Sequence, residues 1–320
     1  MRVLVTGGAG YVGSVVAAQL LAAGHDVLVA DDLSTGHRDA VPRGAEFAQL
    51  GITELGDRMR SWRPDAVIHF AAKSIVAESV REPAAYWRNN VIGTVALLDA
   101  MRSADVLRIV FSSSAAVYGE AAETPIVETA PARPTSPYGA TKLAIDLALA
   151  DYARAFEMSA VSLRYFNVAG ALLSSEGHFG ERHVNETHLI PLALRAVTGQ
   201  IDKLSLFGTD YPTPDGTCIR DYVHVVDLGI AHLRALDLGG PGEHTVVNLG
   251  SGSGYSVREV LAAVEGVTGT AVPVTEAPRR PGDPATLVAS NAAAATLLGW
   301  RPERDLTAMV ADAWGFVRPG

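Results

Sequence analysis

The first 165 residues alternate between short apolar runs and longer amphipathic stretches. Apolar runs of strand length occur at residues 2–6, 26–30, 46–49, 65–70, 108–112 and 160–165. Apolar positions at helical spacing occur between them, at residues 15–23, 53–62, 89–101 and 137–156. Strands and helices that alternate in this way predict an α/β fold with a Rossmann-type, doubly wound parallel sheet. Ligands of such sheets bind at the carboxyl ends of the strands.

The alternation becomes less regular after residue 168. Helical spacing returns at residues 187–197, 256–267 and 291–298, whereas residues 177–186 are polar and without periodicity. Residues 220–226 and 246–250 are expected to return to the large sheet. We therefore predict a large dinucleotide-binding domain of residues 1–168 with 220–250, and a smaller α/β C-terminal substrate domain of residues 169–219 and 251–320. The binding cleft is expected between the two domains.

Composition narrows the class of protein. Of the 320 residues, 48% are hydrophobic and 19% are charged, which is typical of a globular protein with a sizeable core. The formal net charge of −9 argues against nucleic acid and anionic membranes as partners. Cys218 is the only cysteine, so no disulfide can form within the chain. A strand pattern directly after Met1, with no apolar run long enough to span a bilayer, predicts a cytoplasmic protein.

A glycine-rich turn joins the first predicted strand to the first predicted helix. Gly7, Gly10 and Gly13 would let the backbone approach a pyrophosphate, which the helix N-terminus favours electrostatically. Asp31 follows the second strand at close to the spacing expected of an acid that binds the ribose hydroxyls of adenosine. Because a carboxylate there repels a 2′-phosphate, the predicted cofactor is NAD rather than NADP.

Tyr138 and Lys142 lie one turn apart on one face of a predicted helix that Ser136 caps. A phenol ionises near pH 10, so Tyr138 can act as a base near neutrality only if its pKa is lowered. We expect the Lys142 ammonium group to lower that pKa by ~3 units, which corresponds to roughly 4 kcal/mol. Ser114 stands at the carboxyl end of a predicted strand, where this type of sheet carries its chemistry. These residues form the predicted catalytic group.

Four blocks of the sequence resemble the extended short-chain dehydrogenases/reductases. In chain order they are Thr6-Gly7-x-x-Gly10-x-x-Gly13, Ser112-Ser113-Ser114, Tyr138-x-x-x-Lys142 and Arg164-Tyr165-Phe166-Asn167. Residues 210–217, 220–225 and 248–250 are similar to blocks of the UDP-glucose (UDP-galactose) 4-epimerase family within that superfamily. The resemblance extends from Arg2 to about Trp314, nearly the whole chain.

The resemblance implies a mechanism with tightly held NAD. Tyr138 would take the proton of the sugar 4-hydroxyl while hydride leaves C4 for the nicotinamide, Lys142 would hold the cofactor ribose, and Ser114 would hydrogen-bond the sugar 4-oxygen. The 4-keto sugar would then turn over and receive the hydride on its other face. The implied cofactor-binding residues are Gly7, Gly10, Tyr11, Val12, Gly13, Asp31, Asp32, Leu33, Ser34, Thr35, Gly36, Gly51, Ile52, Phe70, Ala71, Ala72, Lys73, Ser74, Asn89, Ser114, Tyr138, Lys142, Tyr165 and Phe166. The implied substrate-binding residues are Ser114, Tyr138, Asn167, His188, Leu189, Leu206, Phe207, Arg220, Arg280, Asp283 and Leu287.

Arginines are the natural ligands of the UDP diphosphate. A guanidinium group pairs with two phosphate oxygens at once, which suits Arg220 and Arg280 to this role. Arg279 stands beside Arg280, so the choice between these two stays open.

Three positions depart from the pattern of the family. Gly51 stands where many relatives have an aspartate that meets the adenine. Lys73 is shifted by one residue from a pyrophosphate-binding lysine, whose place Ser74 takes. Leu287 stands where some strict UDP-galactose enzymes place a tyrosine against the sugar. The smaller Leu287 predicts space for a 2-acetamido group, and hence turnover of UDP-GlcNAc and UDP-GalNAc.

Three histidines follow one another at intervals of five residues. His178, His183 and His188 have Glu181 and Glu186 between them. This spacing matches neither a helix face nor the common zinc motifs, so we predict no metal site. His188 is instead expected to border the nucleotide.

Other functions share this scaffold. A nucleotide-sugar 4,6-dehydratase needs an acid pair after Ser114, where this chain has Ala115-Ala116. A NAD-sensing regulator without turnover would be expected to lose the Tyr–Lys pair, which is intact. An epimerase of another UDP sugar, such as a pentose, would use the same residues and stays open. By the same resemblance, residues 89–101 and 137–156 would pair across a twofold axis, which predicts a homodimer through a four-helix bundle.

Overall fold

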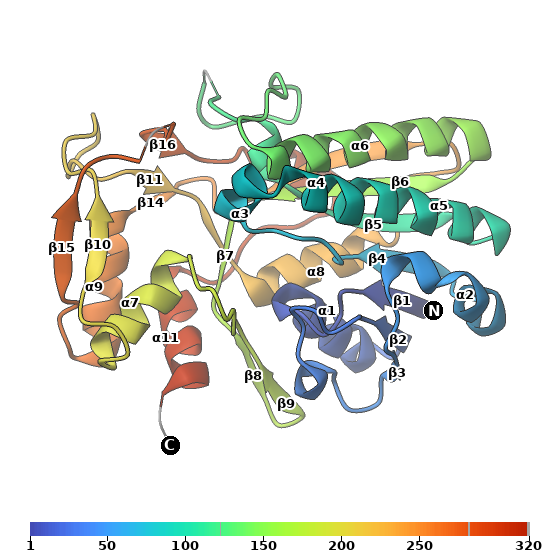
Figure 1. The fold of residues 1–320 in the computed structure, drawn as a ribbon, viewed down its shortest axis with the longest axis horizontal. Coiled ribbons are helices and arrows are strands. Elements are labelled where there is room, and N and C mark those ends of the chain that lie inside the picture. Colours follow the sequence, from blue (N-terminus) through green and yellow to red (C-terminus); the bar gives the residue numbers. More distant parts are fainter. Residues whose placement is uncertain (122, 281, 319–320) are drawn as a thin grey trace.

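A seven-stranded parallel sheet forms the centre of the molecule (Figure 1). The computed structural model describes residues 1–121, 123–280 and 282–318. The strand order is β13-β6-β5-β4-β1-β2-β3. These strands are β1 (Arg2–Thr6), β2 (Asp26–Ala30), β3 (Glu46–Ala48), β4 (Ala66–His69), β5 (Arg108–Ser114), β6 (Ser159–Tyr165) and β13 (His244–Leu249). The order reverses between β1 and β4, which opens a crevice at the carboxyl ends of these strands. The predicted Rossmann-type fold is confirmed.

Helices cover both faces of this sheet because its strands are apolar on both faces. β1 contributes Val3 and Val5 to one core and Leu4 to the other, as the two-residue period of a strand requires. The first face is covered by α1 (Tyr11–Ala22), α8 (Val225–Ala235) and α10 (Ala292–Leu297). The second face is covered by α2 (Gly56–Trp62), α5 (Gly93–Ser103) and α6 (Pro137–Phe156). A π-helical turn (Trp87–Ile92) joins α5 to the short helices α3 (Val76–Arg81) and α4 (Pro83–Tyr86).

Helix α6 has the predicted limits because local signals mark both of its ends. The Ser136 hydroxyl accepts a hydrogen bond of 3.1 Å from the Gly139 amide, and Pro137 occupies the first helical position. Glu157 stops the helix in a left-handed conformation, with φ of 56°. The helix turns Lys142, Asp146 and Leu149 toward the sheet.

The smaller part of the molecule packs around a separate core on the left of Figure 1. Its helices are α7 (Leu189–Val197), α9 (Val257–Thr268) and α11 (Leu306–Val317). Its strands are β10 (Leu204–Phe207), β11 (Ile219–Arg220), β14 (Tyr255–Ser256), β15 (Val274–Ala277) and β16 (Thr286–Leu287). A hairpin of β8 (Leu172–Ser174) and β9 (Gly177–Phe179) occupies part of the stretch expected to be irregular. No helix in the described ranges is both long and apolar enough to cross a membrane.

One predicted strand lies elsewhere than expected. Of the two segments expected to return to the large sheet, only β13 does so. Strand β12 (Tyr222–His224) pairs instead with β7 (Asn167–Ala169) in a two-stranded parallel ribbon. Strand β12 is only three residues long and leads directly into α8. The His224 imidazole caps the start of α8 by accepting a hydrogen bond of 3.1 Å from the Val226 amide. This segment therefore rejoins the large unit through α8, which packs on α1, and not through the sheet.

A buried ion pair ties α6 to the sheet. Asp146 Oδ2 accepts hydrogen bonds from Arg164 Nε at 3.0 Å and from Nη2 at 2.8 Å, and both side chains are at most 7% exposed. Arg164 Nη1 also donates to the Tyr118 hydroxyl at 3.0 Å, which in turn donates to Asn248 Oδ1 at 2.7 Å. The network links α6, β6 and β13 beneath the predicted catalytic helix turn.

We predict that Asp146→Ala lowers the free energy of unfolding by about 3–5 kcal/mol, because it leaves the buried Arg164 guanidinium without its partner. Asp151→Ala is the matched control. Asp151 lies on the same helix and pairs with Arg154, but both side chains are more than 70% exposed, so the expected change stays within about 0.5 kcal/mol. Urea unfolding of both variants measures the difference, and equal losses would contradict a stabilising role of the buried pair.

Candidate active site

A cavity of about 590 Å³ opens at the carboxyl ends of the sheet strands. Every residue of the predicted cofactor set lines it except Leu33. The catalytic candidates Ser114, Tyr138 and Lys142 lie in the same lining, although β5 and α6 are far in sequence from the glycine turn. The fold therefore brings the predicted dinucleotide site and the predicted catalytic group into one space.

The glycine turn has no room for side chains. A Cβ atom on Gly13 would lie 2.3 Å from the Gly7 carbonyl oxygen, and one on Gly7, whose φ is +71°, would lie 2.5 Å from the Ala71 nitrogen. Such close approach leaves the start of α1 open to the cavity, which fits the pyrophosphate of a dinucleotide.

The Asp31 carboxylate organises the adjacent loop. Its Oδ2 accepts from the Ala9 amide at 3.0 Å and its Oδ1 from the Leu33 amide at 2.9 Å, and burial raises the pKa of Asp31. Leu33 adopts a left-handed conformation in this turn, with φ of 60°. It contributes its backbone amide to Asp31, and it does not line the cavity. Asp31 itself lines the cavity, where its oxygens retain lone pairs for ribose hydroxyls. These residues fit an adenine dinucleotide without a 2′-phosphate.

Tyr138, Lys142 and Ser114 meet at the end of β5. Lys142 is 2% exposed, and its Nζ donates to the Ser112 carbonyl at 2.7 Å. The same nitrogen lies 5.8 Å from the centroid of the Tyr138 ring. The Ser114 hydroxyl accepts from the Ala116 amide at 3.1 Å and faces Tyr138. An ammonium group, a phenol and a hydroxyl thus share one buried corner of the cavity.

The electrostatics of this corner differ from the sequence-based expectation. Burial raises the pKa of Tyr138, and the hydrogen bond from Ser114 lowers it only in part. Burial also lowers the pKa of Lys142 to about 7, against the opposing effect of Asp146. The expected lowering of the Tyr138 pKa by Lys142 is therefore wrong for the protein alone, because burial disfavours both the phenolate form of Tyr138 and the ammonium form of Lys142.

A buried asparagine that sequence reasoning missed holds the loop after β4. Asn90 Oδ1 accepts from the Lys73 amide at 2.8 Å, and its Nδ2 donates to the Lys73 carbonyl at 3.0 Å and to Thr141 Oγ1 at 3.2 Å. The Lys73 ammonium lies 3.7 Å from Glu78, beside the cavity. Asn90 thereby links the loop to α6, while the predicted Asn89 lines the cavity.

A second cavity of about 380 Å³ adjoins the first. Both cavities share Asn167, Val168, His188 and Arg220 in their linings. The predicted substrate residues Leu189, Phe207, Arg280 and Asp283 line the second cavity, and Leu287 lines the first. Leu206 lies in neither lining, since it is 1% exposed and packed inside the small unit.

Two arginines face the second cavity. Arg220 forms an ion pair with Asp283, and the Arg280 guanidinium lies 4.0 Å from the centroid of the Phe207 ring. Arg279 instead donates from Nε to Asp210 Oδ1 at 2.7 Å and does not line either cavity. The geometry thus favours Arg280 over Arg279 as the phosphate ligand.

Asp221 holds the backbone that carries Arg220. The fully buried carboxylate accepts from the Ser251 amide at 2.5 Å, from its hydroxyl at 2.7 Å, and from the Ala289 amide at 3.0 Å. Arg220 pairs with Leu287 between β11 and β16. One buried acid therefore positions an arginine of the second cavity and a leucine of the first.

Comparison with protein families agrees with this arrangement. The model of the NAD dependent epimerase/dehydratase family matches residues 3–250. This chain belongs to that family. The resemblance drawn from the sequence motifs is confirmed, and epimerases of this family are also the relatives that match along nearly the entire chain.

Three of these family members illustrate the likeness. The UDP-glucose 4-epimerase of Corynebacterium glutamicum is 52% identical over 99% of this chain and 96% of that protein. A crystal structure of the Brucella ovis UDP-glucose 4-epimerase in complex with NAD is 46% identical, covers 98% of both chains and superimposes with a TM-score of 0.94. The Bifidobacterium longum enzyme in complex with NAD+ and UDP is 36% identical over 99% of this chain and 98% of its own, with a TM-score of 0.91.

We predict that Gly13→Ala abolishes retention of NAD during purification, because the added Cβ would lie 2.3 Å from the Gly7 carbonyl oxygen and the turn must open. Gly266→Ala is the control. Gly266 lies inside α9 with no atom within 4 Å of the added Cβ, so NAD content stays unchanged and stability rises by about 0.5–1 kcal/mol. Cofactor released from denatured protein gives the content, and a Gly13→Ala protein that keeps its NAD refutes the assignment of the turn.

Proposed function

We propose that this member of the epimerase/dehydratase family interconverts UDP-glucose and UDP-galactose by reversible oxidation at C4, with NAD tightly bound. The observation that carries the proposal is the meeting of Ser114, Tyr138 and Lys142 in the lining of the cavity that also holds the glycine turn. Full-length relatives with this activity support it, as do the relatives crystallised with NAD and with UDP.

The residues of the chain supply proton transfer and orientation. Bound NAD supplies the hydride acceptor at C4 and, in its oxidised form, a positive charge beside the phenol. Tyr138 takes the proton of the 4-hydroxyl through its phenolic oxygen and returns it after the sugar has turned over. Ser114 hydrogen-bonds the same sugar oxygen, and Lys142 holds the cofactor ribose and shares its charge with the phenolate.

The adjoining cavity suits the UDP part of the substrate. Arg220 and Arg280 face it with guanidinium groups that can pair with diphosphate oxygens, and Asp283 orients Arg220. Asn167 stands between the two cavities, where a sugar joined to a diphosphate would pass. We assign these residues, with His188, Leu189 and Phe207, to UDP binding.

The chemistry of the cavity argues against dehydration. Ala115 and Ala116 follow Ser114 in a short turn, and the described acids of the lining are Asp31, Asp32 and Glu181, all outside the corner of Tyr138. Elimination of water would need a proton donor next to Ser114. The same residues would serve an epimerase of a UDP-pentose, which the substrate assay below distinguishes.

We also propose a homodimer in the cytoplasm. Helices α4, α5 and α6 lie side by side on one face of the sheet (Figure 1). Leu147 of α6 is 61% exposed, and Ile92, at the end of the π-helical turn that leads into α5, is 60% exposed. Two such surfaces would bury these side chains in a four-helix bundle. The division into a dinucleotide domain of residues 1–168 with 220–250 and a substrate domain of residues 169–219 with 251–320 is part of the same proposal.

We expect Tyr138→Phe to reduce turnover of UDP-galactose by about 10²–10⁴-fold while NAD stays bound, because only the proton-carrying oxygen is removed. Tyr152→Phe is the control, since Tyr152 lies on the same helix but donates to Asp99 at the surface. Coupled assay of UDP-glucose formation measures both variants. Undiminished turnover by Tyr138→Phe would overturn the proposed function.

The space beside Leu287 decides whether acetamido sugars are accepted. We expect the protein to epimerise UDP-GalNAc as well as UDP-galactose, and Leu287→Tyr to reduce turnover of UDP-GalNAc at least about tenfold while UDP-galactose is still converted. Chromatography of the UDP sugars at equilibrium gives both rates, and a UDP-pentose is assayed alongside. Undetectable conversion of UDP-GalNAc by the unaltered protein would refute this substrate range.

A further inference from the structure

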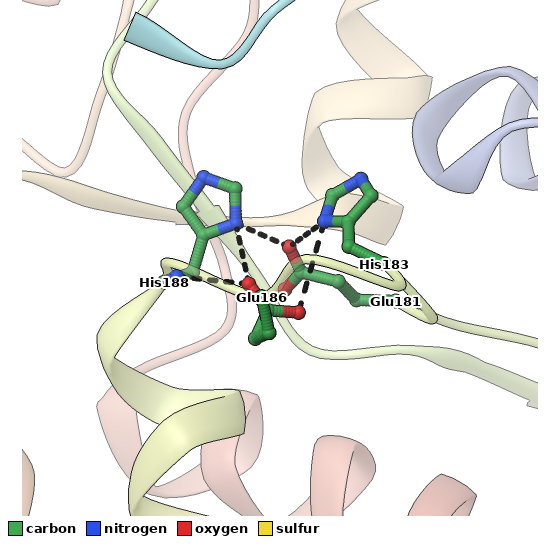
Figure 2. Close-up of side chains that lie close together, drawn as sticks. All are labelled: Glu181, His183, Glu186 and His188. Atoms are coloured by element: carbon green, nitrogen blue, oxygen red, sulfur yellow. Dashed lines mark hydrogen bonds and ion pairs between the residues drawn. The ribbon is translucent and has the colours of Figure 1, made fainter. Parts of the chain in front are cut away.

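Four potential metal ligands converge in the segment between β9 and α7. Glu181, His183, Glu186 and His188 each offer one ligand atom, and these atoms all lie within 4.8 Å of one another. Figure 2 shows both imidazoles turning a ring nitrogen toward the two carboxylates. Within the part of the chain that the structure describes, this is the one group of its kind. Glu181, His183 and His188 also line the first cavity, and His188 is among the residues assigned above to UDP binding. The proposed proton transfer uses none of the four side chains as an acid or a base.

The separations between ligand atoms suit a small tetrahedral ion. Zinc lies about 2.1 Å from nitrogen and oxygen ligands, which places tetrahedral ligands roughly 3.4 Å apart. His183 Nδ1 lies 3.0 Å from Glu181 Oε1 and 3.7 Å from Glu186 Oε2, and His188 Nδ1 lies 3.3 Å from Glu186 Oε1. His188 Nδ1 also contacts Glu181. Glu186 makes its two contacts through different oxygens, and one ligand atom from each of the four residues lies within 4.8 Å of the others. The group is therefore of the size of a small ion's coordination sphere, and a bound ion would set the ligand spacing to roughly 3.4 Å.

The buried carboxylates need a compensating positive charge. The Glu186 side chain is 1% exposed and that of Glu181 is 7% exposed, so two neighbouring anions are removed from water. Among the described ion pairs, neither has an arginine or lysine as partner. Arg182, which stands between them in sequence, directs its guanidinium to Asp39 at 2.8 Å. A divalent cation held by two neutral imidazoles would balance both carboxylates.

The segment is already braced from outside the cluster. Arg195 donates to the His183 carbonyl at 3.0 Å, and His37, from the loop after β2, contacts the Arg182 carbonyl at 3.1 Å. Within the cluster, Glu186 Oε1 accepts from the His188 amide at 2.8 Å. Such contacts hold ligands in place before a metal arrives, as the outer contacts of metal sites do.

We propose that Glu181, His183, Glu186 and His188 bind one divalent transition-metal ion of the zinc class in a closed, structural site. Two nitrogen and two oxygen ligands from the protein fill a tetrahedral coordination sphere and leave no position for substrate. The ion fastens the segment that touches the cofactor loop through His37 and leads into α7, whose first residue, Leu189, lines the second cavity. The site is independent of which sugar the enzyme converts.

The proposed site differs from the sequence-based prediction that no metal is bound. Intervals of five between histidines match no zinc motif, but His178 is not part of the cluster, and the two carboxylates supply the missing ligands. The competing explanation is a closed set of ion pairs in which both imidazoles carry an additional proton and no metal enters.

Metal binding to the full-length protein tests the proposal without reading enzyme activity. After removal of metals with a chelator and dialysis, we expect titration calorimetry to give one Zn²⁺ per chain, and Co²⁺ to give the intense visible absorption of a tetrahedral site. His183→Gln and Glu186→Gln should weaken Zn²⁺ binding on the order of 100-fold or more. His178→Gln, which alters the nearby exposed histidine outside the cluster, should leave it unchanged.

Two results would overturn the site. One is the absence of Zn²⁺ binding by the folded, chelator-treated protein, which favours the closed ion pairs. The other is binding that His183→Gln and His178→Gln weaken equally. If Glu186→Gln does not fold, His183→Gln decides the outcome alone, since that side chain is 33% exposed. If the unaltered protein binds Zn²⁺ but does not epimerise any UDP sugar, the proposed function is refuted and the metal site is still supported.

Discussion

The hydrogen bond from the buried Lys142 ammonium to the Ser112 carbonyl is the contact on which the catalytic edge depends. It fixes α6 against the end of β5 and thereby sets Tyr138, one turn earlier, opposite Ser114. The approach is close enough that a Cβ on Gly139 would lie 2.3 Å from the Ala116 carbonyl oxygen. The start of α6 therefore packs directly on the backbone after β5, which holds Tyr138 and Ser114 close to each other.

Desolvation shapes this edge as strongly as geometry does. A site closed enough to exclude water also disfavours the charged forms of its residues, which raises the pKa of Tyr138 and lowers that of Lys142. In the proposed mechanism the protein supplies orientation, and oxidised NAD would supply further positive charge. Proton transfer would then depend on oxidised NAD being bound, because burial raises the pKa of Tyr138 in the protein alone.

Local signals were enough to predict the six strands and four of the helices of the first 165 residues, together with most of the cavity lining, but not α3, α4, α8 or α11. Ser136 and Pro137 mark the start of α6, and the glycines of the first turn and Asp31 follow a spacing that backbone geometry imposes. The residues around His183 were considered from the sequence, but that they converge could not be predicted, because they lie in a loop where no period relates position in the sequence to position in space. Leu206 was misplaced for a similar reason, since which side of a short strand faces a cavity depends on the neighbouring strand. The raised pKa of Tyr138 follows from burial, which only the folded chain reveals.

The hydrogen bonds of Asp221 bear on how the preference for one sugar over another could change. Its carboxylate clamps the backbone of Ser251 and Ala289 around the β11–β16 pairing, so Arg220 and Leu287 rest on one rigid frame. Under the proposed roles, exchanging the leucine side chain would reshape the wall around the hexose while the arginine that binds the diphosphate keeps its position. Selectivity for the sugar and affinity for its carrier are therefore separable traits, open to independent adjustment by evolution or by design.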